Sequence, residues 1–237
     1  MRIAVFSDIH ANLPALLSVL RDIAKVGVDM KVCLGDLVGY APFPNEVTEK
    51  IKELAIPTIM GNYDQGVGFD LEDCGCAYRT EEERTLGHVS LLWTRETVTP
   101  ENKAFLRNLL PRFELEIAPF RLLFVHGSPR RINEYLFPDR PDASFLNMMA
   151  QESANVLVCG HTHIPFFRKI ERLFVINDGS VGRPKDGDWR ATWALVEVND
   201  TVVVSFRRCE YDLEPLYKAY AQSGLPKKFL EDILPHR

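Results

Sequence analysis

Residues 2–10 read Arg-Ile-Ala-Val-Phe-Ser-Asp-Ile-His, a stretch in which four consecutive apolar side chains, Ile3 to Phe6, end at polar residues. A short apolar run bounded by polar residues predicts a buried strand, here over Arg2–Ser7. Because the run stops before Asp8, it is far too short for the apolar core of a secretory signal peptide. The stretch therefore combines a core strand with two side chains, Asp8 and His10, that can do chemistry at its end.

The next fifty residues alternate between helical and strand patterns. Leucines recur at helical spacing from residue 13 to residue 20, which predicts a helix over Leu13–Val26 with Pro14 in its first turn. A second helix is expected over Pro44–Leu54, between strands at Lys31–Leu34 and Ile56–Met60. This β-α-β-α-β order predicts a parallel sheet.

Residues 64–111 differ in pattern and predict a helical lobe inserted after the third strand, with an acidic run, Glu81–Glu83, and a short helix over Glu101–Leu110. A helical tail is expected at about 211–237. Between lobe and tail, strands are predicted over Glu114–Ile117, Arg121–Val125, Val156–Cys159, Phe166–Ile170, Leu173–Asn177, Thr192–Val198 and Val202–Arg208. The last four suit antiparallel hairpins. Two β-rich halves predict an α/β protein of two packed sheets with helices outside, in a single domain over 1–237.

Composition excludes several classes of protein. The chain has 237 residues, of which 46% are hydrophobic and 26% charged, an ordinary globular balance that argues against disorder. Its 28 basic and 33 acidic residues give a net charge of −5, which makes duplex nucleic acid an unexpected partner. No apolar run approaches the roughly 20 residues of a membrane span. The odd count of five cysteines favours reduced thiols, so we expect a cytoplasmic protein.

Metal-binding residue types directly follow five of the predicted strands. Ligands of open α/β sheets bind beyond the carboxyl ends of the strands, so these clusters are expected to meet. Four of the six histidines lie in them. The clusters are Asp8 with His10, Gly35-Asp36, Gly61-Asn62, His126-Gly127 and Gly160-His161-Thr162-His163.

Each cluster also has a structural interpretation when taken alone. Asp8 could cap the following helix, Asp36 and Asn62 beside glycine could be turn residues, and a lone histidine is often a satisfied polar side chain. His161 and His163 are harder to dismiss, because alternate residues of an extended or turning chain point the same way and can meet one metal. The occurrence of all five clusters at strand ends favours a metal site.

With these motifs the sequence resembles the calcineurin-like metallophosphoesterase superfamily, and its small prokaryotic phosphodiesterase branch in particular. The motifs stand in family order as Asp8-Ile9-His10, Gly35-Asp36, Gly61-Asn62-Tyr63-Asp64, His126-Gly127 and Gly160-His161-Thr162-His163. The resemblance implies a four-layer α/β/β/α sandwich of two mixed sheets, which agrees with the two-sheet pattern above.

The resemblance also implies two divalent metal ions. One would be held by Asp8, His10, Asp36 and His163, and the other by Asp36, Asn62, His126 and His161, with Asp36 as the bridge. Mixed nitrogen and oxygen donors fit Mn, Fe, Ni, Co or Zn, and residue identity does not choose among them. Two metals, two carboxylates and a metal-bridging hydroxide leave a charge of about +1 to attract phosphate.

Asp36, Asn62, Tyr63 and His126 are the residues we expect to act in catalysis. Tyr63 stands where the family motif has a histidine that is often assigned as the acid for the leaving group. A phenol with an ordinary pKa of about 10 is a poor proton donor near neutral pH, and Tyr63 could equally be a packing residue. His88 on the inserted helix could replace the acid, although a solvated helix histidine is the simpler interpretation.

Basic residues near two motifs could bind substrate phosphates. These are Arg130, beside Arg131 after the His126 motif, and Arg183 and Lys185 after Asn177–Gly182. The alternative is that these basic residues are surface side chains that only keep the protein soluble. Cys74-Gly75-Cys76 could hold a soft metal, but two thiols without nearby partners are more simply residues of the lobe.

These features predict a dinuclear-metal phosphoesterase that hydrolyses phosphodiester or phosphoanhydride bonds in small phosphorylated substrates such as aryl diesters, nucleotides or dinucleoside polyphosphates. The alternatives are a phosphomonoesterase or protein phosphatase, and a non-catalytic scaffold that keeps the fold. The complete set of ligand positions counts against the scaffold. The lobe or the tail could also serve formation of a homo-oligomer.

Overall fold

The computed structural model describes residues 1–234, which form nine strands and eight helices. The strands are Arg2–Phe6 (β1), Met30–Cys33 (β2), Phe113–Ile117 (β3), Phe120–Phe124 (β4), Val156–Cys159 (β5), Phe166–Ile170 (β6), Leu173–Asn177 (β7), Ala191–Val198 (β8) and Val202–Cys209 (β9). The helices are Leu13–Val26 (α1), Pro44–Glu53 (α2), Asn62–Gly68 (α3), Glu81–Thr97 (α4), Pro100–Arg107 (α5), Asp142–Met149 (α6), Glu214–Ser223 (α7) and Lys227–Glu231 (α8).

The strands form two mixed sheets. One sheet has the order β2-β1-β8-β9, in which only β1 and β2 run parallel. The other has the order β3-β4-β5-β7-β6, in which β4, β5 and β7 run parallel and the two edge strands are antiparallel. The predicted hairpins β6-β7 and β8-β9 are confirmed.

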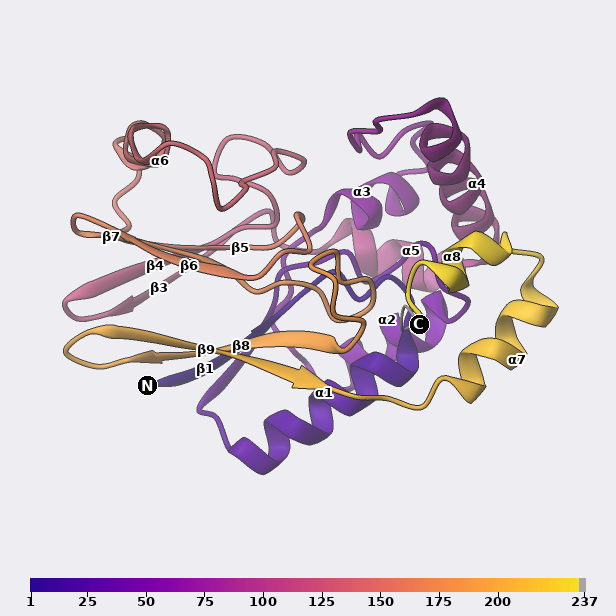
Figure 1. The fold of residues 1–237 in the computed structure, drawn as a ribbon, viewed down its shortest axis with the longest axis horizontal. Helices are drawn as coiled ribbons and strands as arrows, with labels where there is room; N and C mark the ends of the chain where they lie inside the picture. Colours follow the sequence, from indigo (N-terminus) through magenta and orange to yellow (C-terminus); the bar gives the residue numbers. More distant parts are fainter. Residues whose placement is uncertain (235–237) are drawn as a thin grey trace.

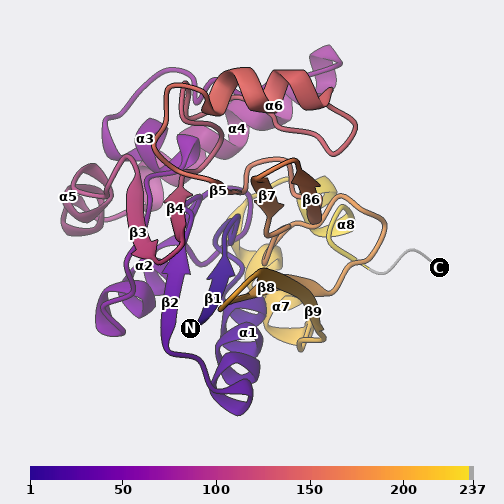
Figure 2. The same ribbon diagram turned by 90° about the vertical axis from the view of Figure 1, so that its left-hand side faces the viewer.

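The two sheets pack face to face, with helices on both outer sides (Figure 1). Alternate residues of β1 serve different layers: Ile3 and Val5 belong to the cluster between the sheets, whereas Ala4 and Phe6 pack toward α1. In the second sheet, Phe124 faces the first sheet while Leu123 joins the cluster beneath α6. Figure 2 shows the same layering nearly end-on, with α6 and α1 on opposite sides. The four-layer α/β/β/α fold is therefore confirmed.

Two local expectations differ from the structure. Residues 56–60 form no strand but only two isolated bridges, Cys33 with Thr58 and Ile59 with Leu110. Pro57 has no N–H to donate, and β2 ends at Cys33, so the segment meets only the last residue of its neighbour. Helix α6 was not expected, because its eight residues lie in a stretch without a strong periodicity.

The helical tail is divided into two helices. Gly224 adopts a left-handed backbone with φ 75°, which ends α7, and Pro226 directly precedes α8. Residues 235–237, at the end of the predicted tail, lie outside the described residues. Over residues 1–234, none of the helices combines the length and the apolar character that crossing a membrane would require.

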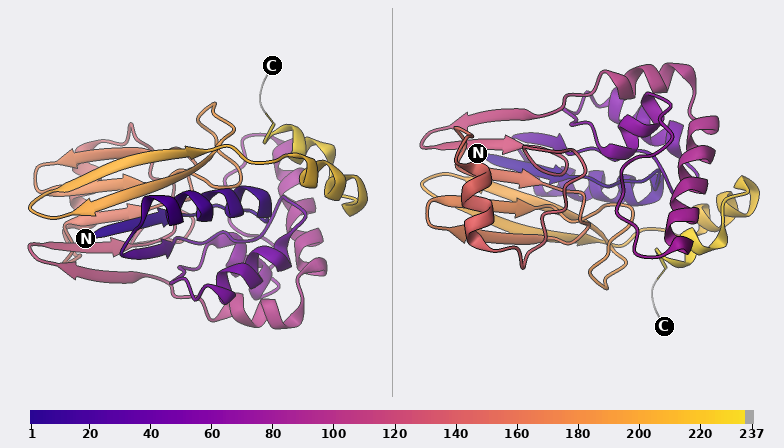
Figure 3. Two further views of the ribbon diagram at one scale, coloured as in Figure 1. Left: turned by 90° about the horizontal axis from the view of Figure 1, so that it is seen from below. Right: turned by 90° about the horizontal axis from the view of Figure 1, so that it is seen from above.

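The inserted helices and the C-terminal helices lie together at one end of the sandwich (Figure 3). One hydrophobic cluster joins the first sheet and α1 to both groups, through residues such as Leu91 of α4, Leu216 of α7 and Phe229 of α8. The loops that leave the strand ends on this side are thus enclosed by helices from two distant parts of the sequence.

We predict that Phe124→Ala will lower the free energy of unfolding by about 3–5 kcal/mol, because the ring is fully buried between the sheets and leaves a cavity. Urea unfolding followed by circular dichroism measures the change. Val203→Ala on β9, where the side chain is 48% exposed, is the control and should cost about 1 kcal/mol or less. Equal losses for the two variants would contradict the assignment of the core to the space between the sheets.

Candidate active site

Five of the polar residues at the strand ends have a left-handed backbone, which is unfavourable for residues other than glycine. They are Asp8, His10, Asp36, His161 and His163, with φ between 47° and 66°. Such conformations cost about 1–3 kcal/mol each and persist only where the surrounding structure determines them. Their concentration in these loops, which follow β1, β2 and β5, marks a functional site.

Hydrogen bonds between the loops hold this backbone in place. Asp8 N donates to Gly35 O at 2.9 Å and His10 N to Asp36 O at 2.9 Å, so the loops after β1 and β2 are tied residue by residue. Gly182 N, from the loop after β7, donates to Asp8 O at 2.9 Å. These hydrogen bonds therefore hold the three loops in position relative to one another, although none of the loops is a helix or a strand.

Glycine is required where two of these loops come closest. A Cβ atom on Gly61 would lie 2.1 Å from Asp36 Oδ1, and one on Gly35 would lie 2.4 Å from Gly61 N. Gly35 also has a left-handed backbone, with φ 93°. The Gly-Asp and Gly-Asn pairs of the sequence thus serve a close backbone approach that brings Asp36 beside Asn62.

Asp64 holds this approach together, and sequence reasoning gave it no role. One carboxylate oxygen, Oδ2, accepts from the backbone N–H of Asp36 at 2.8 Å and of Gly61 at 3.0 Å. The other, Oδ1, accepts from Leu37 N at 2.9 Å. The available signal was its position in the quoted motif, two residues after Asn62. Asp64 is a positioning residue that binds the two turns to each other.

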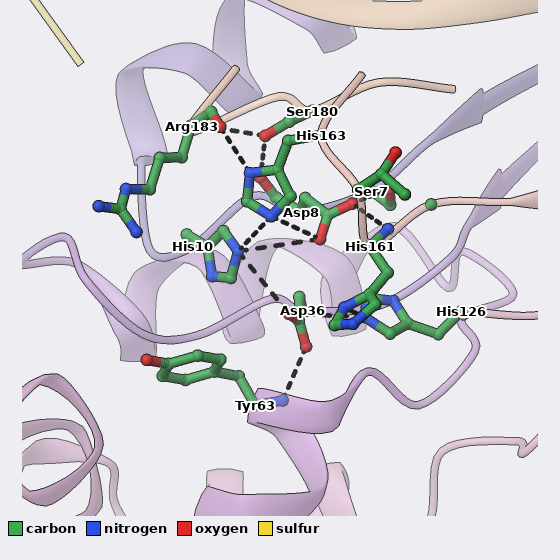
Figure 4. Close-up of polar contacts among 12 residues, drawn as sticks. Ser7, Asp8, His10, Asp36, Tyr63, His126, His161, His163, Ser180 and Arg183 are labelled. Atoms are coloured by element: carbon green, nitrogen blue, oxygen red, sulfur yellow. Dashed lines mark hydrogen bonds and ion pairs between the residues drawn. The ribbon is translucent and has the colours of Figure 1, made fainter. Parts of the chain in front are cut away.

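Asp8, His10 and His163 form a first cluster of donor atoms (Figure 4). Asp8 Oδ1 lies 3.2 Å from His163 Nε2 and 3.8 Å from His10 Nε2, and the two Nε2 atoms are 3.3 Å apart. The other Asp8 oxygen, Oδ2, accepts from Ser7 Oγ at 2.7 Å and from His161 N at 2.9 Å. Only Oδ1 is thus directed at the two histidines.

Asp36, His126 and His161 form a second cluster, which Asn62 joins. His126 Nε2 lies 3.2 Å from His161 Nδ1, 3.1 Å from Asn62 Oδ1 and 3.5 Å from Asp36 Oδ2. Asp36 Oδ2 is also 3.7 Å from His10 Nε2 in the first cluster. One carboxylate oxygen therefore lies between the two clusters.

Backbone carbonyls fix the protonation of three imidazoles. The Nδ1 atoms of His10, His126 and His163 face the carbonyl oxygens of Val38, Leu34 and Arg183 at 3.1, 2.7 and 2.5 Å. A proton on Nδ1 makes each of these bonds and leaves the Nε2 lone pair directed into the site. Burial lowers the pKa of all four site histidines below the ordinary value, so they are neutral near pH 7.

The two clusters fit divalent metal ions. In each, acceptor faces acceptor: Nε2 of His10 faces Nε2 of His163, and Nε2 of His126 faces Asn62 Oδ1. Asp8 Oδ1 is buried without a hydrogen bond partner among residues 1–234. Lone pairs that converge in this way repel unless a cation lies between them. Donors about 2.1 Å from one metal lie about 3.0–3.4 Å apart, which matches the closer distances within each cluster.

A cavity of about 770 Å³ opens over the clusters. His10, Asp36, His161 and His163 form its base, and side chains of the lobe and of α8 form its walls. Predicted residues Arg183 and Lys185 line it. So do aromatic side chains that sequence reasoning did not single out, because nothing in the sequence relates them to the motifs; examples are Tyr40, Tyr135, Phe137 and Phe229.

Tyr63 contacts the site through its backbone and its ring rather than its hydroxyl group. Its N–H donates to Asp36 Oδ1 at 2.8 Å, while the ring runs past His10 at a centroid distance of 5.4 Å (Figure 4). The hydroxyl oxygen is buried and has no hydrogen bond partner within residues 1–234. Burial raises the pKa of Tyr63 well above its ordinary value, so the group is a weak acid.

Two other predicted candidates lie away from the cavity. Arg130 is half exposed and pairs with Glu134 through both Nε and Nη2, which leaves the substrate role without support. His88 is exposed on α4 and does not line the cavity, as the simpler interpretation of it expected.

A family model, the calcineurin-like phosphoesterase superfamily domain, matches residues 1–201. The chain belongs to this superfamily. It is a metal-dependent phosphoesterase, and the expectation from the motifs is confirmed.

Relatives and solved structures cover nearly the whole chain. An uncharacterized protein of Methanocaldococcus jannaschii, MJ0912, is 35% identical over 95% of this chain and 94% of its own length. The phosphodiesterase YfcE of Escherichia coli is 27% identical over 86% of this chain and 91% of its own. A metallophosphoesterase of Sphaerobacter thermophilus is similar in structure, with a TM-score of 0.78 and 28% identity over 99% of this chain and 98% of that chain.

This metallophosphoesterase completes its cavity with residues beyond the matched domain. Lys228, Phe229 and Asp232 line the cavity, although the family model ends at residue 201. Phe229 packs edge-on against Tyr40 at 5.4 Å, and Asp232 accepts a hydrogen bond from Arg183 at 2.6 Å. The tail therefore forms part of the wall of the cavity.

We predict that Asp64→Asn will lower the free energy of unfolding by about 1–3 kcal/mol and reduce the metal content, because an amide NH₂ cannot accept from the N–H groups that the carboxylate binds. Urea unfolding and plasma emission analysis measure the two effects. Asp70→Asn is the matched control, since Asp70 is an exposed carboxylate just after α3 and its surface ion pairs with Arg95 and Lys103 contribute little. If the two variants behave alike, Asp64 does not hold the turns together.

Proposed function

We propose that the two clusters bind two divalent metal ions bridged by Asp36, and that the protein hydrolyses phosphodiester or phosphoanhydride bonds. The observation that carries the proposal is the position of Asp36 Oδ2, 3.7 Å from His10 Nε2 and 3.5 Å from His126 Nε2. An oxygen in this position can contribute to both clusters at once. Asp8, His10 and His163 complete one ligand set, and Asn62, His126 and His161 complete the other.

Bound metals of this kind supply Lewis acidity, which activates water and offsets the charge of a phosphate. The chain leaves the metal identity open among Mn, Fe, Ni, Co and Zn. Its own residues hold the donors rigidly: three imidazoles are oriented by carbonyls, and Asp36 Oδ1 is fixed by Tyr63 N. Pre-oriented donors reduce the reorganisation needed when the charge develops in the transition state.

Arg183 and Lys185 are the groups that would bind substrate phosphate. The Arg183 guanidinium lies 4.0 Å from the centroid of the Tyr40 ring and donates to Asp232, so its position is fixed before a substrate arrives. Lys185 lines the same cavity and has no ion-pair partner within residues 1–234. A phosphate above the clusters would contact both the planar guanidinium of Arg183 and the compact ammonium of Lys185.

The aromatic wall of the cavity favours substrates with a ring in the leaving group or the second ester. Tyr135 and Phe137 stack with an interplanar angle of 9°, and Tyr135 packs on the His161 ring at 4.1 Å. Aryl diesters, nucleotides and dinucleoside polyphosphates combine such rings with phosphate. The related YfcE of Escherichia coli is named a phosphodiesterase, which supports the diester preference.

The free thiols of all five cysteines support a cytoplasmic location. A phosphomonoesterase or protein phosphatase is the main alternative. A panel of aryl diesters, dinucleoside polyphosphates, aryl monoesters and phosphoserine peptides decides between them, and higher kcat/KM for both kinds of monoester would overturn the diester preference.

The role of the bridge is tested by Asp36→Asn. Because the amide is neutral and cannot bridge two cations with one charged oxygen, we expect kcat/KM to fall by at least about 10³-fold and the metal content to drop below two per chain. Plasma emission and steady-state kinetics measure the two quantities. Asp200→Asn, in the exposed turn between β8 and β9, should change neither. Two bound metals with near-normal turnover in Asp36→Asn would refute the bridge.

The environment of Tyr63 predicts a dependence on the leaving group. General acid help is worth roughly 10²–10⁴-fold for poor leaving groups, and the buried Tyr63 hydroxyl is too weak an acid to give it. For aryl diesters of graded leaving-group pKa, log kcat/KM should therefore fall steeply as that pKa rises. Tyr63→His should flatten the slope, with its gain at the poorest leaving groups.

Tyr63→Phe is the control for this series, because it removes the hydroxyl group and keeps the ring. It should retain the steep slope of the unchanged protein. A flat slope in the unchanged protein would show that another group already supplies the proton, and the preference for good leaving groups would have no basis.

A further inference from the structure

Two cysteines lie side by side at the edge of the cavity. Cys74 and Cys76 belong to the segment between α3 and α4, and their Sγ atoms are 3.1 Å apart. Cys76 is half-buried and lines the cavity, whereas Cys74 is 7% exposed and packs into the main hydrophobic cluster. The pair is thus reachable from the cavity on one side only.

The same pair contacts a residue of the second donor cluster. Asn62 Nδ2 donates to Cys74 O at 3.0 Å and to Cys76 Sγ at 3.2 Å. These two contacts place the amide nitrogen away from the cluster, so that Asn62 Oδ1 faces His126 Nε2 at 3.1 Å. Cys76 therefore takes part in orienting the oxygen that Asn62 offers to a metal.

We propose that Cys74 and Cys76 form a reversible disulfide on exposure to a peroxide, and that this bond weakens metal binding at the cluster of Asn62. The second half of the proposal rests on the proposed role of Asn62 as a ligand. The first half does not depend on any metal.

The chemistry balances with a peroxide as the oxidant. One sulfur of the pair attacks one peroxide oxygen, the O–O bond breaks, and water leaves, which converts that thiol to a sulfenic acid. The other thiol then attacks this sulfur, the S–OH bond breaks, and a second water leaves. Two thiols lose two electrons in total, and hydrogen peroxide is reduced to two waters. A dithiol reductant reverses the bond by exchange.

Closing the bond needs little movement. A disulfide holds its sulfurs about 2.05 Å apart, so the two Sγ atoms must approach by about 1 Å. The intervening Gly75 has φ 71° and already bends the chain, and residues 72–78 belong to no helix or strand. That shift takes Cys76 Sγ out of its present position beside Asn62 Nδ2. The amide then loses one of the two contacts that orient it.

The other three cysteines provide internal controls. Cys33 and Cys159 are fully buried in β2 and β5, and Cys209 is buried at the end of β9. None of the three lines the cavity described above. A peroxide that reaches the site from the cavity should therefore oxidise the pair 74/76 first.

The first experiment maps the thiols. The full-length protein is treated with stoichiometric hydrogen peroxide, freed of peroxide, denatured, alkylated and digested for mass spectrometry. We expect the peptide that holds Cys74 and Cys76 to lose two hydrogens and resist alkylation, while Cys33, Cys159 and Cys209 are alkylated. Dithiothreitol should restore both thiols. Full alkylation of the pair after peroxide would overturn the proposal, whatever the protein hydrolyses.

The second experiment measures the consequence. Metal-free protein, oxidised or reduced and freed of peroxide, is titrated with Mn²⁺ by calorimetry. We expect the weaker of two sites to lose about 10–100-fold in affinity on oxidation, the range found when an outer-shell partner of a ligand is removed. An unchanged affinity in protein with the disulfide would overturn the link to Asn62, while the proposed function would stand.

Variants separate the disulfide from general oxidation. Cys76→Ser should show the same Mn²⁺ affinities before and after peroxide, because it cannot form the bond and carries no sulfur beside Asn62. Cys209→Ser should respond like the unchanged protein. Loss of affinity on oxidation in Cys76→Ser would assign the effect to another oxidised group and overturn the proposal.

Discussion

The site depends on the hydrogen bonds that tie the loop after β1 to the loop after β2. Asp8 and His10 donate their backbone N–H groups to Gly35 and Asp36, and this pairing continues the parallel alignment of β1 and β2 into irregular chain. It holds Asp8, His10 and Asp36 in left-handed backbone, from which their side chains converge. The strands align the two loops, and the backbone of the loops directs the donor side chains toward one another.

Two further interactions extend this constraint to the rest of the molecule. Asp64 ties the turn at Gly61 to Asp36, which brings Asn62 to the second cluster. Gly160 N donates to His126 O at 2.9 Å, which joins the loops after β5 and β4 of the other sheet. Each sheet thus contributes donor side chains, and the two clusters form where the loops that leave the two sheets meet. The two clusters can form only if the two sheets pack in one fixed position relative to each other.

The fold and the donor set were predictable because they follow from local pattern. The sequence pattern identified all nine described strands to within one residue at either end, and helical periodicity identified α1 from Leu13 to Val26. Apart from Asn62, which follows residues 56–60, the donors were predictable because they directly follow those strands. The structure of residues 56–60 was not predictable in this way. An apolar run indicates that a segment is buried, but not whether a neighbouring strand is long enough to pair with it.

The walls of the cavity could not be predicted in the same way. Phe229 and Asp232 reach the site from the far end of the chain, and their contacts with Tyr40 and Arg183 depend on how α8 packs. Cys76 lies fourteen residues beyond Asn62, in a segment without periodicity, so nothing in the sequence relates its sulfur to that amide. Long-range packing of irregular chain leaves no local pattern to recognise.

The tyrosine at position 63 connects the packing of the site with its chemistry. Gly39 leaves room for its ring: a Cβ atom there would lie 2.4 Å from Tyr63 Cδ1. The ring fills this space against Tyr40, with centroids 4.9 Å apart, and continues the aromatic side of the cavity up to His10. The Tyr63 hydroxyl is buried and has no hydrogen bond partner among the described residues, so the tyrosine supplies no proton to a leaving group. The same packing that buries this hydroxyl places aromatic rings beside His10. A leaving group that needs no proton and carries a ring would satisfy both conditions, so the proposed substrate preference rests on one residue rather than on two separate features.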